Sequence, residues 1–200
     1  FSASDTVNYQ APVRTGVDMT VFQDGLTLGA QPLDFSDRDQ YVDALQQAAN
    51  FGGISLSGTY RITFNDNGTL THQRSLGGGS WAPPVTVDTS TGNGAIYVSG
   101  DAYISGEVRG SLTLAARSDI FIEDDLTYAS ATTKDHSDAA FDETVITDAL
   151  GLIATDSVVI TSRTEVNVHG SILVTGGGFG CEGRYENLGE PSINLFGGLT

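Results

Sequence analysis

Short apolar stretches alternate with turn residues in the middle of the chain, between Gly94 and Tyr128. Within each stretch two apolar side chains are spaced by two residues, which places both on one face of a β-strand. The pairs are Ile96 with Val98, Ala102 with Ile104, Leu112 with Leu114, and Ile120 with Ile122. Glycine, serine and aspartate between the pairs favour turns. Because no 3.6-residue apolar period runs through this stretch, the pattern predicts strands rather than helices.

The same pattern returns later in the chain at two different spacings. Residues 108–114 match residues 168–174 at an offset of 60, and residues 112–122 match residues 150–160 at an offset of 38. Ser192-Ile-Asn-Leu195 begins one more copy. A repeated unit that cannot bury its apolar face alone has to stack on its neighbours. We therefore predict a mainly β fold, a parallel β-solenoid whose coils carry insertions.

The N-terminal part carries different signals. An amphipathic helix is expected at about residues 37–50, because Ser36 is a suitable N-cap and Gly52 a suitable stop. A hairpin is expected at about residues 60–72, because alternating stretches flank the turn Asn65-Asp-Asn-Gly68. The sequence thus predicts a mainly β chain with an N-terminal helix and hairpin.

These signals divide the chain into two segments. We expect residues 1–90 to form an N-terminal α+β segment and residues 91–200 to form the solenoid. The repeat is interrupted at residues 129–149 and again at residues 176–191. Since excursions from a solenoid usually carry its contacts, both insertions are candidate interaction surfaces.

Charge narrows the choice of partners. The formal net charge is −16 at pH 7, which argues against binding nucleic acid or an anionic membrane surface. No run of about 18 apolar residues is present, so contact with a membrane would need an upstream anchor removed from this chain, which begins with Phe1 rather than Met. The single cysteine, Cys181, excludes an internal disulfide.

The first insertion is rich in carboxylates. Asp135, Asp138, Asp142 and Glu143 are candidate Ca²⁺ ligands, because calcium accepts six to eight oxygen ligands in flexible geometry. Their spacing matches neither an EF-hand loop nor the nonapeptide calcium repeat. A solvated acidic loop explains the same residues, and the sequence leaves both interpretations open.

Motifs of catalysis are missing from the sequence. There is no HExxH, CxxC or GxSxG, and the three histidines are far apart, with His169 at the repeat position that Arg109 occupies in a turn. We therefore predict a non-enzymatic protein with no catalytic residue. The alternative is a carbohydrate-binding or carbohydrate-active β-helix protein, either a glycan-binding module or a polysaccharide hydrolase or lyase. Four aromatic residues that alternate with the inward positions are candidates for a glycan-contacting row: Tyr97, Tyr103, Phe121 and Tyr128.

Several of these segments, taken in order, resemble the PilX-like, type IV pilus-associated proteins of bacteria. The matching segments cover about two thirds of the chain: Leu33-Asp-Phe35 with the helix to Asn50, Ile62 to Thr69, Ala95 to Tyr128, and Leu150 to Ile160. The resemblance implies a pilin-type membrane helix upstream, a cell-surface or envelope location, and no enzymatic activity. The short repeats are also similar at the fold level to those of bactofilins, polymerising β-helical scaffolds, which implies that open coil ends can stack.

From these observations we expect a structural or adhesive subunit of the cell surface or envelope, part of a pilus-like or filamentous assembly. Its expected partners are further copies of itself, other surface or pilus subunits, or a glycan. No cofactor is expected other than Ca²⁺ at the first insertion.

Overall fold

A computed structural model of the chain describes residues 7–9, 26–28, 39–161, 165–181 and 193–200. The chain divides into two compact units, Phe1–Asp37 and Arg38–Thr200. In the first unit, the described residues form a parallel pair of short strands, β1 (Val7–Tyr9) and β2 (Leu26–Leu28). All features below belong to the second unit.

The second unit begins with helix α1 (Asp39–Asn50) and continues mainly in β-strands. The strands are β3 (Ile54–Leu56), β4 (Tyr60–Asn65), β5 (Thr69–Gly77), β6 (Ser80–Trp81), β7 (Val85–Asp88), β8 (Ala95–Val98), β9 (Ala102–Val108), β10 (Ser111–Ala116), β11 (Ile120–Tyr128), β12 (Ala149–Ala154), β13 (Val158–Ile160), β14 (Val166–Val174), β15 (Phe179–Cys181) and β16 (Ile193–Leu199). A short 3₁₀ helix occupies Glu143–Val145. The predicted mainly β chain with an N-terminal helix and a hairpin is confirmed, and residues 37 and 38 of the predicted helix lie outside the described residues.

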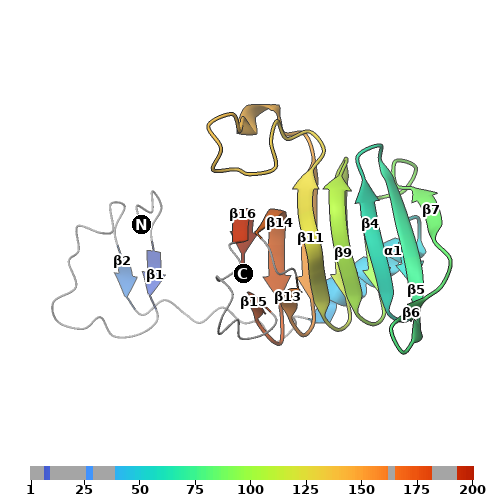
Figure 1. Cartoon of the computed structure of the whole chain (residues 1–200). Coiled ribbons are helices and arrows are strands. Elements are labelled where there is room, and N and C mark those ends of the chain that lie inside the picture. The colour runs from blue at the N-terminus through green and yellow to red at the C-terminus, as the bar shows by residue number, and fades with distance from the viewer. Residues whose placement is uncertain (1–6, 10–25, 29–38, 162–164, 182–192) are drawn as a thin grey trace, which may run out of the picture. The chain divides into compact units, whose positions relative to one another are not determined.

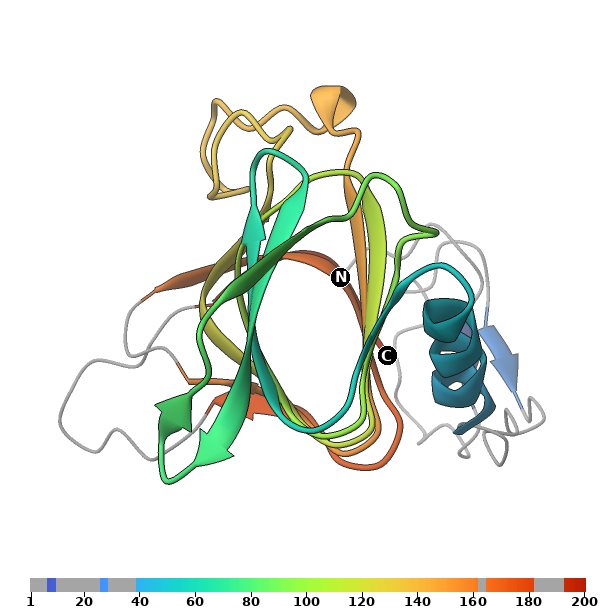
Figure 2. The ribbon, with the colours of Figure 1, turned by 90° about the vertical axis from the view of Figure 1, so that its right-hand side faces the viewer.

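The strands form one curled, mixed sheet (Figure 1). One side of the curl has the order β3-β8-β10-β12-β14, and the other has β4-β9-β11, which β14 joins by pairing with both β11 and β12. All pairs along these two sides are parallel, whereas β5 is antiparallel to β4, β6 and β7. Seen from the end that carries β4 and β5, the successive strands lie behind one another around a common interior (Figure 2).

The residues that lie side by side in neighbouring strands test the two repeat offsets, 60 and 38, that were read from the sequence. The offset of 38 is confirmed, because Leu112 lies beside Leu150 and Ile120 beside Val158. The offset of 60 is wrong by two residues: Leu114 pairs with Leu152, which pairs with Ile172, an offset of 58. A shift of two keeps every side chain on its original face, so the apolar pattern could not detect it.

A strand expected after Ser192 is present as β16, but its register differs from the predicted one. Ile193 and Leu195 lie beside Val166 and Val168, although the sequence pattern aligned them with the residues that follow Ser171. Ser192, which opens the predicted copy, lies outside the described residues.

The main core lies inside the curl and consists of the inward residues of every layer. Ile104, Leu114 and Leu152 are completely buried and belong to this cluster. A smaller core lies on the outside, where α1 packs against β8 and β10 through Val42, Ala49, Ala95, Tyr97 and Ala115. The helix therefore covers the outer face of part of the sheet.

Helix α1 and the hairpin belong to the same compact unit as the repeats. Strand β4 pairs with β9 over five residues, across the segment boundary expected near residue 90. The expected division therefore does not coincide with the division between the compact units, which falls after Asp37.

The two ends of the curl differ. At the β4 end, β5 and β7 continue the sheet in the antiparallel sense, and they place Leu70, completely buried, and Val87 against the core. At the opposite end, β16 pairs with β14, and no described strand pairs with the other edge of β16. The β4 end therefore has its core covered by β5 and β7, although β3 and β7 each pair with a single described strand, and at the opposite end β16 is the last described strand.

Two glycines with left-handed backbone test the close contact between neighbouring strands. Gly106 (φ 107°) and Gly110 (φ 90°) both strain any other residue, but an added Cβ overlaps the Phe64 carbonyl only at Gly106 and meets open space at Gly110. We expect Gly110→Ala to lower the free energy of unfolding by about 1 kcal/mol and Gly106→Ala by more than about 3 kcal/mol. Chemical denaturation measures both, and equal losses would contradict contact between the layers at this point.

Candidate functional site

The first insertion projects from the corner between β11 and β12, and one carboxylate closes its base. Asp148 is 8% exposed, and its two oxygens accept hydrogen bonds from the backbone N–H of Gly110 (2.6 Å) and of Ser130 (2.7 Å). It therefore ties the start and the end of the insertion to the turn between β9 and β10. Asp148 lies within the insertion expected at residues 129–149, and the structure gives it a positioning role.

His169 on β14 anchors the middle of the insertion. The side chain is completely buried, its Nδ1 accepts the backbone N–H of Tyr128 (3.1 Å), and its Nε2 lies 2.8 Å from the carbonyl oxygen of Lys134. Because Nδ1 accepts, the proton of the neutral ring is on Nε2, which donates to Lys134. Burial lowers the pKa of His169 below its usual 6.5. The prediction that His169 occupies a turn position is wrong, because β14 runs through it without interruption.

Aromatic rings surround this imidazole. The ring centres of Tyr128, Phe141 and Phe196 lie 5.2, 5.7 and 5.6 Å from that of His169. Tyr128 belongs to β11, Phe141 to the insertion, His169 to β14 and Phe196 to β16, so four separate parts of the chain meet here. We call these four residues the His169 cluster.

Lys134 adds an ionic contact between the insertion and the sheet. Its ammonium lies 3.2 Å from Glu107 on β9 and 3.8 Å from Asp125 on β11. Asp125 also accepts the backbone N–H of Asn167 (2.9 Å). Since the lysine side chain is 52% exposed, these ion pairs orient the loop more than they stabilise it.

The proposed calcium ligands lie on the exposed part of the insertion, where three of them each organise a local turn. Asp135 accepts from the backbone of Ser137 (2.8 Å), Asp138 from Ala140 (2.9 Å) and Asp142 from Thr144 (3.0 Å). Hydrogen bonds from the side chains and backbones of Ser137 and Thr144 lower the pKa of Asp135 and of Asp142.

Glu143, the fourth proposed ligand, is exposed in the 3₁₀ helix. Within the described part of the chain, no group of three or more His, Cys, Asp or Glu is arranged to hold a metal ion. The calcium site therefore stays a prediction.

Two of the four aromatic residues selected from the sequence form an outward row. Tyr103 on β9 and Phe121 on β11 are stacked with ring centres 4.6 Å apart, and Trp81 meets Tyr103 edge-on at 5.5 Å. The guanidinium of Arg61 lies 4.5 Å above the Trp81 ring and forms two hydrogen bonds to Glu123, at 2.8 and 2.9 Å. We call these five residues the aromatic row.

The other two aromatic residues have structural roles. Tyr97 also points out of the curl, but α1 covers it and leaves it 3% exposed. Tyr128 belongs to the His169 cluster. Trp81 and Arg61 were missed by sequence analysis, because the hairpin that brings them to this face carries no repeat signal.

A charged groove continues from the aromatic row across β4, β9 and β11. Its volume is about 440 Å³. Its lining combines hydroxyl and amide groups with four carboxylates and one ammonium: Thr63, Phe64, Asn65, Asp66, Ser105, Gly106, Glu107, Asp124, Asp125 and Lys134. The groove is polar and carries net negative charge, which suits a neutral or amine-bearing ligand.

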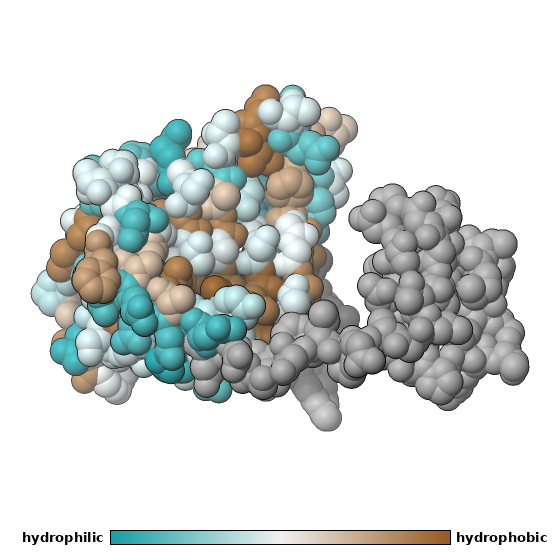
Figure 3. Space-filling model, turned by 180° about the vertical axis from the view of Figure 1, so that it is seen from behind, coloured by the Kyte–Doolittle hydropathy of each residue, from teal (hydrophilic) through white to brown (hydrophobic). Residues whose placement is uncertain are grey.

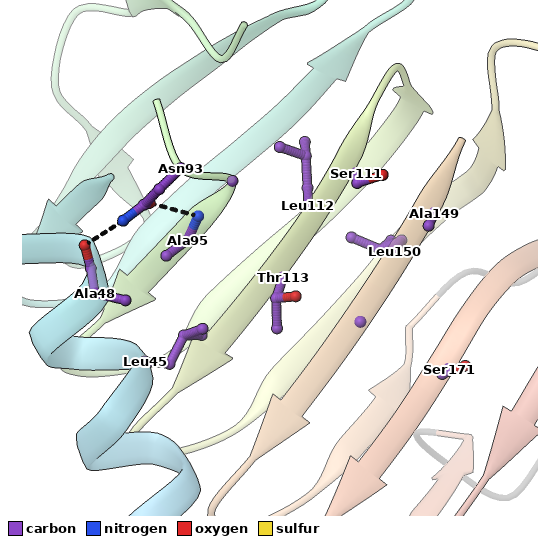
Figure 4. A pocket seen from close by; sticks show the side chains of 12 residues that line it. Leu45, Ala48, Asn93, Ala95, Ser111, Leu112, Thr113, Ala149, Leu150 and Ser171 are labelled. Carbon is purple, nitrogen blue, oxygen red and sulfur yellow. Dashed lines mark hydrogen bonds between the residues drawn. The ribbon is translucent and has the colours of Figure 1, made fainter. Parts of the chain in front are cut away.

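A second groove of about 440 Å³ lies between α1 and the outer face of β10, β12 and β14. Figure 4 shows small side chains on its floor, among them Ser111, Thr113 and Ser171, and Leu45 on the helix side. Asn93 fixes this end of the helix by donating to the Ala48 carbonyl (2.8 Å) and accepting the Ala95 N–H (3.1 Å). No ionisable side chain is among the twelve lining residues, so this groove offers no acid, base or charged anchor. Seen from behind, residues of neutral or apolar character fill the middle of this face (Figure 3).

The calcium prediction has a direct test. If calcium binds the insertion, millimolar Ca²⁺ raises the melting temperature of the parent chain, and the variant Asp138→Asn with Asp142→Asn melts at the same temperature with and without calcium. Scanning calorimetry with and without a chelator measures the shift, and Mg²⁺ is the matched control ion. No calcium-dependent shift in the parent would end the hypothesis.

Three further observations concern the class of protein to which the chain could belong. Cys181 is exposed on β15, and no helix among the described residues is long and apolar enough to cross a membrane. Comparison with family models, with curated proteins and with solved structures found no match to this chain. The interpretation of function therefore depends on the residues and contacts described above.

Proposed function

We propose that the chain is a non-enzymatic structural or adhesive subunit, built as a short parallel β-solenoid that associates through its open end. In this proposal it works at the cell surface or envelope within a pilus-like or filamentous assembly, as the resemblance to PilX-like proteins implies. The observation that carries the proposal is the edge of β16 with which no described strand pairs, beside half-exposed apolar residues of the last layer.

Support for the solenoid comes from the repeated parallel registers. Leu114 lies beside Ile96 on one side and Leu152 on the other, and Ile122 likewise lies between Ile104 and Ile160. Stacks of like residues in register are the defining packing of coils that repeat along an axis.

The last layer differs from the inner layers in burial. Val166, Val168 and Ile172 on β14 are buried. The residues beside them on β16 are less so, because Ile193 and Leu195 are only half-buried and Leu199 is 49% exposed. A further layer would bury these side chains in the way that β14 and β16 cover their neighbours.

The backbone of β16 is also prepared for pairing. The N–H of Thr200 donates to the Ile172 carbonyl (2.9 Å) and the Thr200 carbonyl accepts from Val174 (3.0 Å), so both polar groups of Thr200 face β14. Alternate residues of a parallel strand bond to opposite neighbours, and the N–H and carbonyl of Leu199 therefore face the open edge. Because both copies would use the same β16 edge, this contact joins two copies by like ends, and a filament would need a second contact elsewhere on the pair.

A charge placed on the open edge tests this association. We expect the parent chain to form pairs at concentrations of tens of micromolar and Leu199→Lys to remain monomeric, because a lysine at the edge opposes strand pairing. Light scattering coupled to size-exclusion chromatography measures the mass, and electron microscopy shows whether the pairs are rods.

Val145→Lys is the matched control, because Val145 is 43% exposed on the insertion and the substitution changes the charge equally. It should associate as the parent does. A monomeric parent chain, or equal association of the parent and Leu199→Lys, would contradict the open-end proposal.

The alternative function, carbohydrate binding, is favoured by a separate observation, the aromatic row beside the charged groove. Ring faces stack on sugar C–H groups, and carboxylates and amides bond to neighbouring hydroxyls. Because the groove carries four carboxylates and one ammonium, it would take neutral or amine-bearing oligosaccharides rather than polyuronates.

The carbohydrate alternative predicts the effect of one ring. Tyr103→Ala should weaken oligosaccharide binding by about fivefold or more, since one stacking ring contributes about 1 kcal/mol or more. A glycan array with neutral, amine-bearing and uronate oligosaccharides identifies the ligand, and calorimetric titration gives the affinity. Tyr41→Ala is the matched control, because Tyr41 is 53% exposed on α1, away from the row. Equal weakening in both variants, or no binding by the parent, would reject the alternative.

A further inference from the structure

The contacts of His169 admit one protonation state of its ring. Nδ1 must be a bare acceptor for the N–H of Tyr128, and Nε2 must carry the proton that it donates to the carbonyl of Lys134. A second proton would have to sit on Nδ1. There it would point at another N–H group, and the hydrogen bond to Tyr128 would be lost.

The surroundings compensate a positive charge on this ring only in part, because burial outweighs the Lys134 carbonyl and Asp125, which both favour the charged form. Tyr128, Phe141 and Phe196 pack around it, and it has no exposed surface. Asp125 is the nearest acidic influence, but its Oδ1 accepts from Asn167 and its Oδ2 faces Lys134.

Other charged and titratable groups around the cluster come from three parts of the chain. The insertion contributes His136, whose charge would repel that of His169, together with Lys134, and it contributes Asp148 at its base. Strand β11 contributes Asp125 and Tyr128, and β9 contributes Glu107, which pairs with Lys134. Strand β16 contributes only the uncharged ring of Phe196.

These contacts connect the ring directly to the insertion. Lys134 and Phe141 lie on the insertion, and both touch His169. We propose that the stretch 131–142 is an acid-released latch, held closed on the sheet by neutral His169 and released when that ring takes up a proton. The inference goes beyond the proposed function, and it holds whether or not the chain assembles.

Release of the latch would expose aromatic side chains that the closed loop covers. The base of the insertion stays in place, because Asp148 holds Gly110 and Ser130 by bonds in which no histidine takes part. The middle of the loop would leave, and the rings of Tyr128 and Phe196 would become accessible. At neutral pH this surface consists of turns and carboxylates. After release it would consist of aromatic rings on and beside β16.

The direction of the pH effect follows from linkage. Burial lowers the pKa of His169 in the closed form, whereas once the loop is released the ring on β14 is exposed and its pKa returns to the ordinary value near 6.5. The closed form is therefore fully favoured above about pH 6.5 and loses its advantage as the pH falls below that value, until the lower pKa of the closed form is reached. Asp135 and Asp142, whose pKa values are lowered, stay ionised through this window.

Lys134 makes the latch measurable, because it is the one lysine in the sequence. A lysine-specific protease therefore cuts the chain at a single bond, inside the latch. Between about pH 7.5 and pH 5.5 the open fraction should rise by up to about tenfold, and the cleavage rate with it, once normalised to the same bond in the denatured chain.

Two variants separate His169 from other acid effects. His169→Asn keeps an acceptor near Tyr128 but does not titrate, so its normalised cleavage rate should not depend on pH. His72→Asn is the matched control, because His72 lies on β5 and its pKa is also lowered by burial; it should keep the full pH dependence of the parent. If His169→Asn kept that dependence, the proposal would be overturned.

Hydrogen exchange on the parent chain gives an answer even if His169→Asn fails to fold. After correction for the intrinsic pH dependence of exchange, peptides within 131–142 should lose protection at about pH 5.5, while β10 and β12 keep theirs. Unchanged protection of 131–142, or equal loss throughout the chain, would contradict a local latch.

Discussion

The fold depends on burial of apolar side chains by the neighbouring layer. Each strand has apolar residues on one face and cannot cover them alone, so it is stable only against the neighbouring strands of the sheet, as β10 is between β8 and β12. Ile104 shows the result, with Ile62 on one side, Ile122 on the other, and no exposed surface. The irregular features lie at the two ends of the sheet, at β5 with β7 and at β16, and at the first insertion between β11 and β12.

Sequence patterns predicted those features that depend on local periodicity. The strand pairs, the helix to Asn50, the hairpin around Gly68 and the register of Leu112 with Leu150 all follow from alternation, turn residues and capping. The registers of β14 and β16 could not be predicted from these patterns, because a slip of two residues leaves the apolar side chains on the same face. The match of Val108 and Val168 was therefore convincing in sequence, yet the pairing places Leu126 beside Val168.

The candidate site was harder to predict, because its residues act through distant partners. His169 was assigned to a turn, whereas it is buried by rings from β11, the insertion and β16. The carboxylates predicted to bind calcium, such as Asp138, accept hydrogen bonds within their own turns. Asp148, which holds the base of the insertion, is also an aspartate in the same loop, so residue type could not distinguish it. Burial, which periodicity cannot reveal for an irregular loop, separates the two roles.

Asp148 has a consequence for how such a chain can change over evolutionary time. Because one carboxylate holds both Ser130 and Gly110, the ends of the insertion are fixed close together independently of what lies between them. The entropy of closing a longer loop grows only slowly with its length. Segments of quite different size and composition can therefore be exchanged at this corner, which makes it a natural point for grafting a peptide or a small domain.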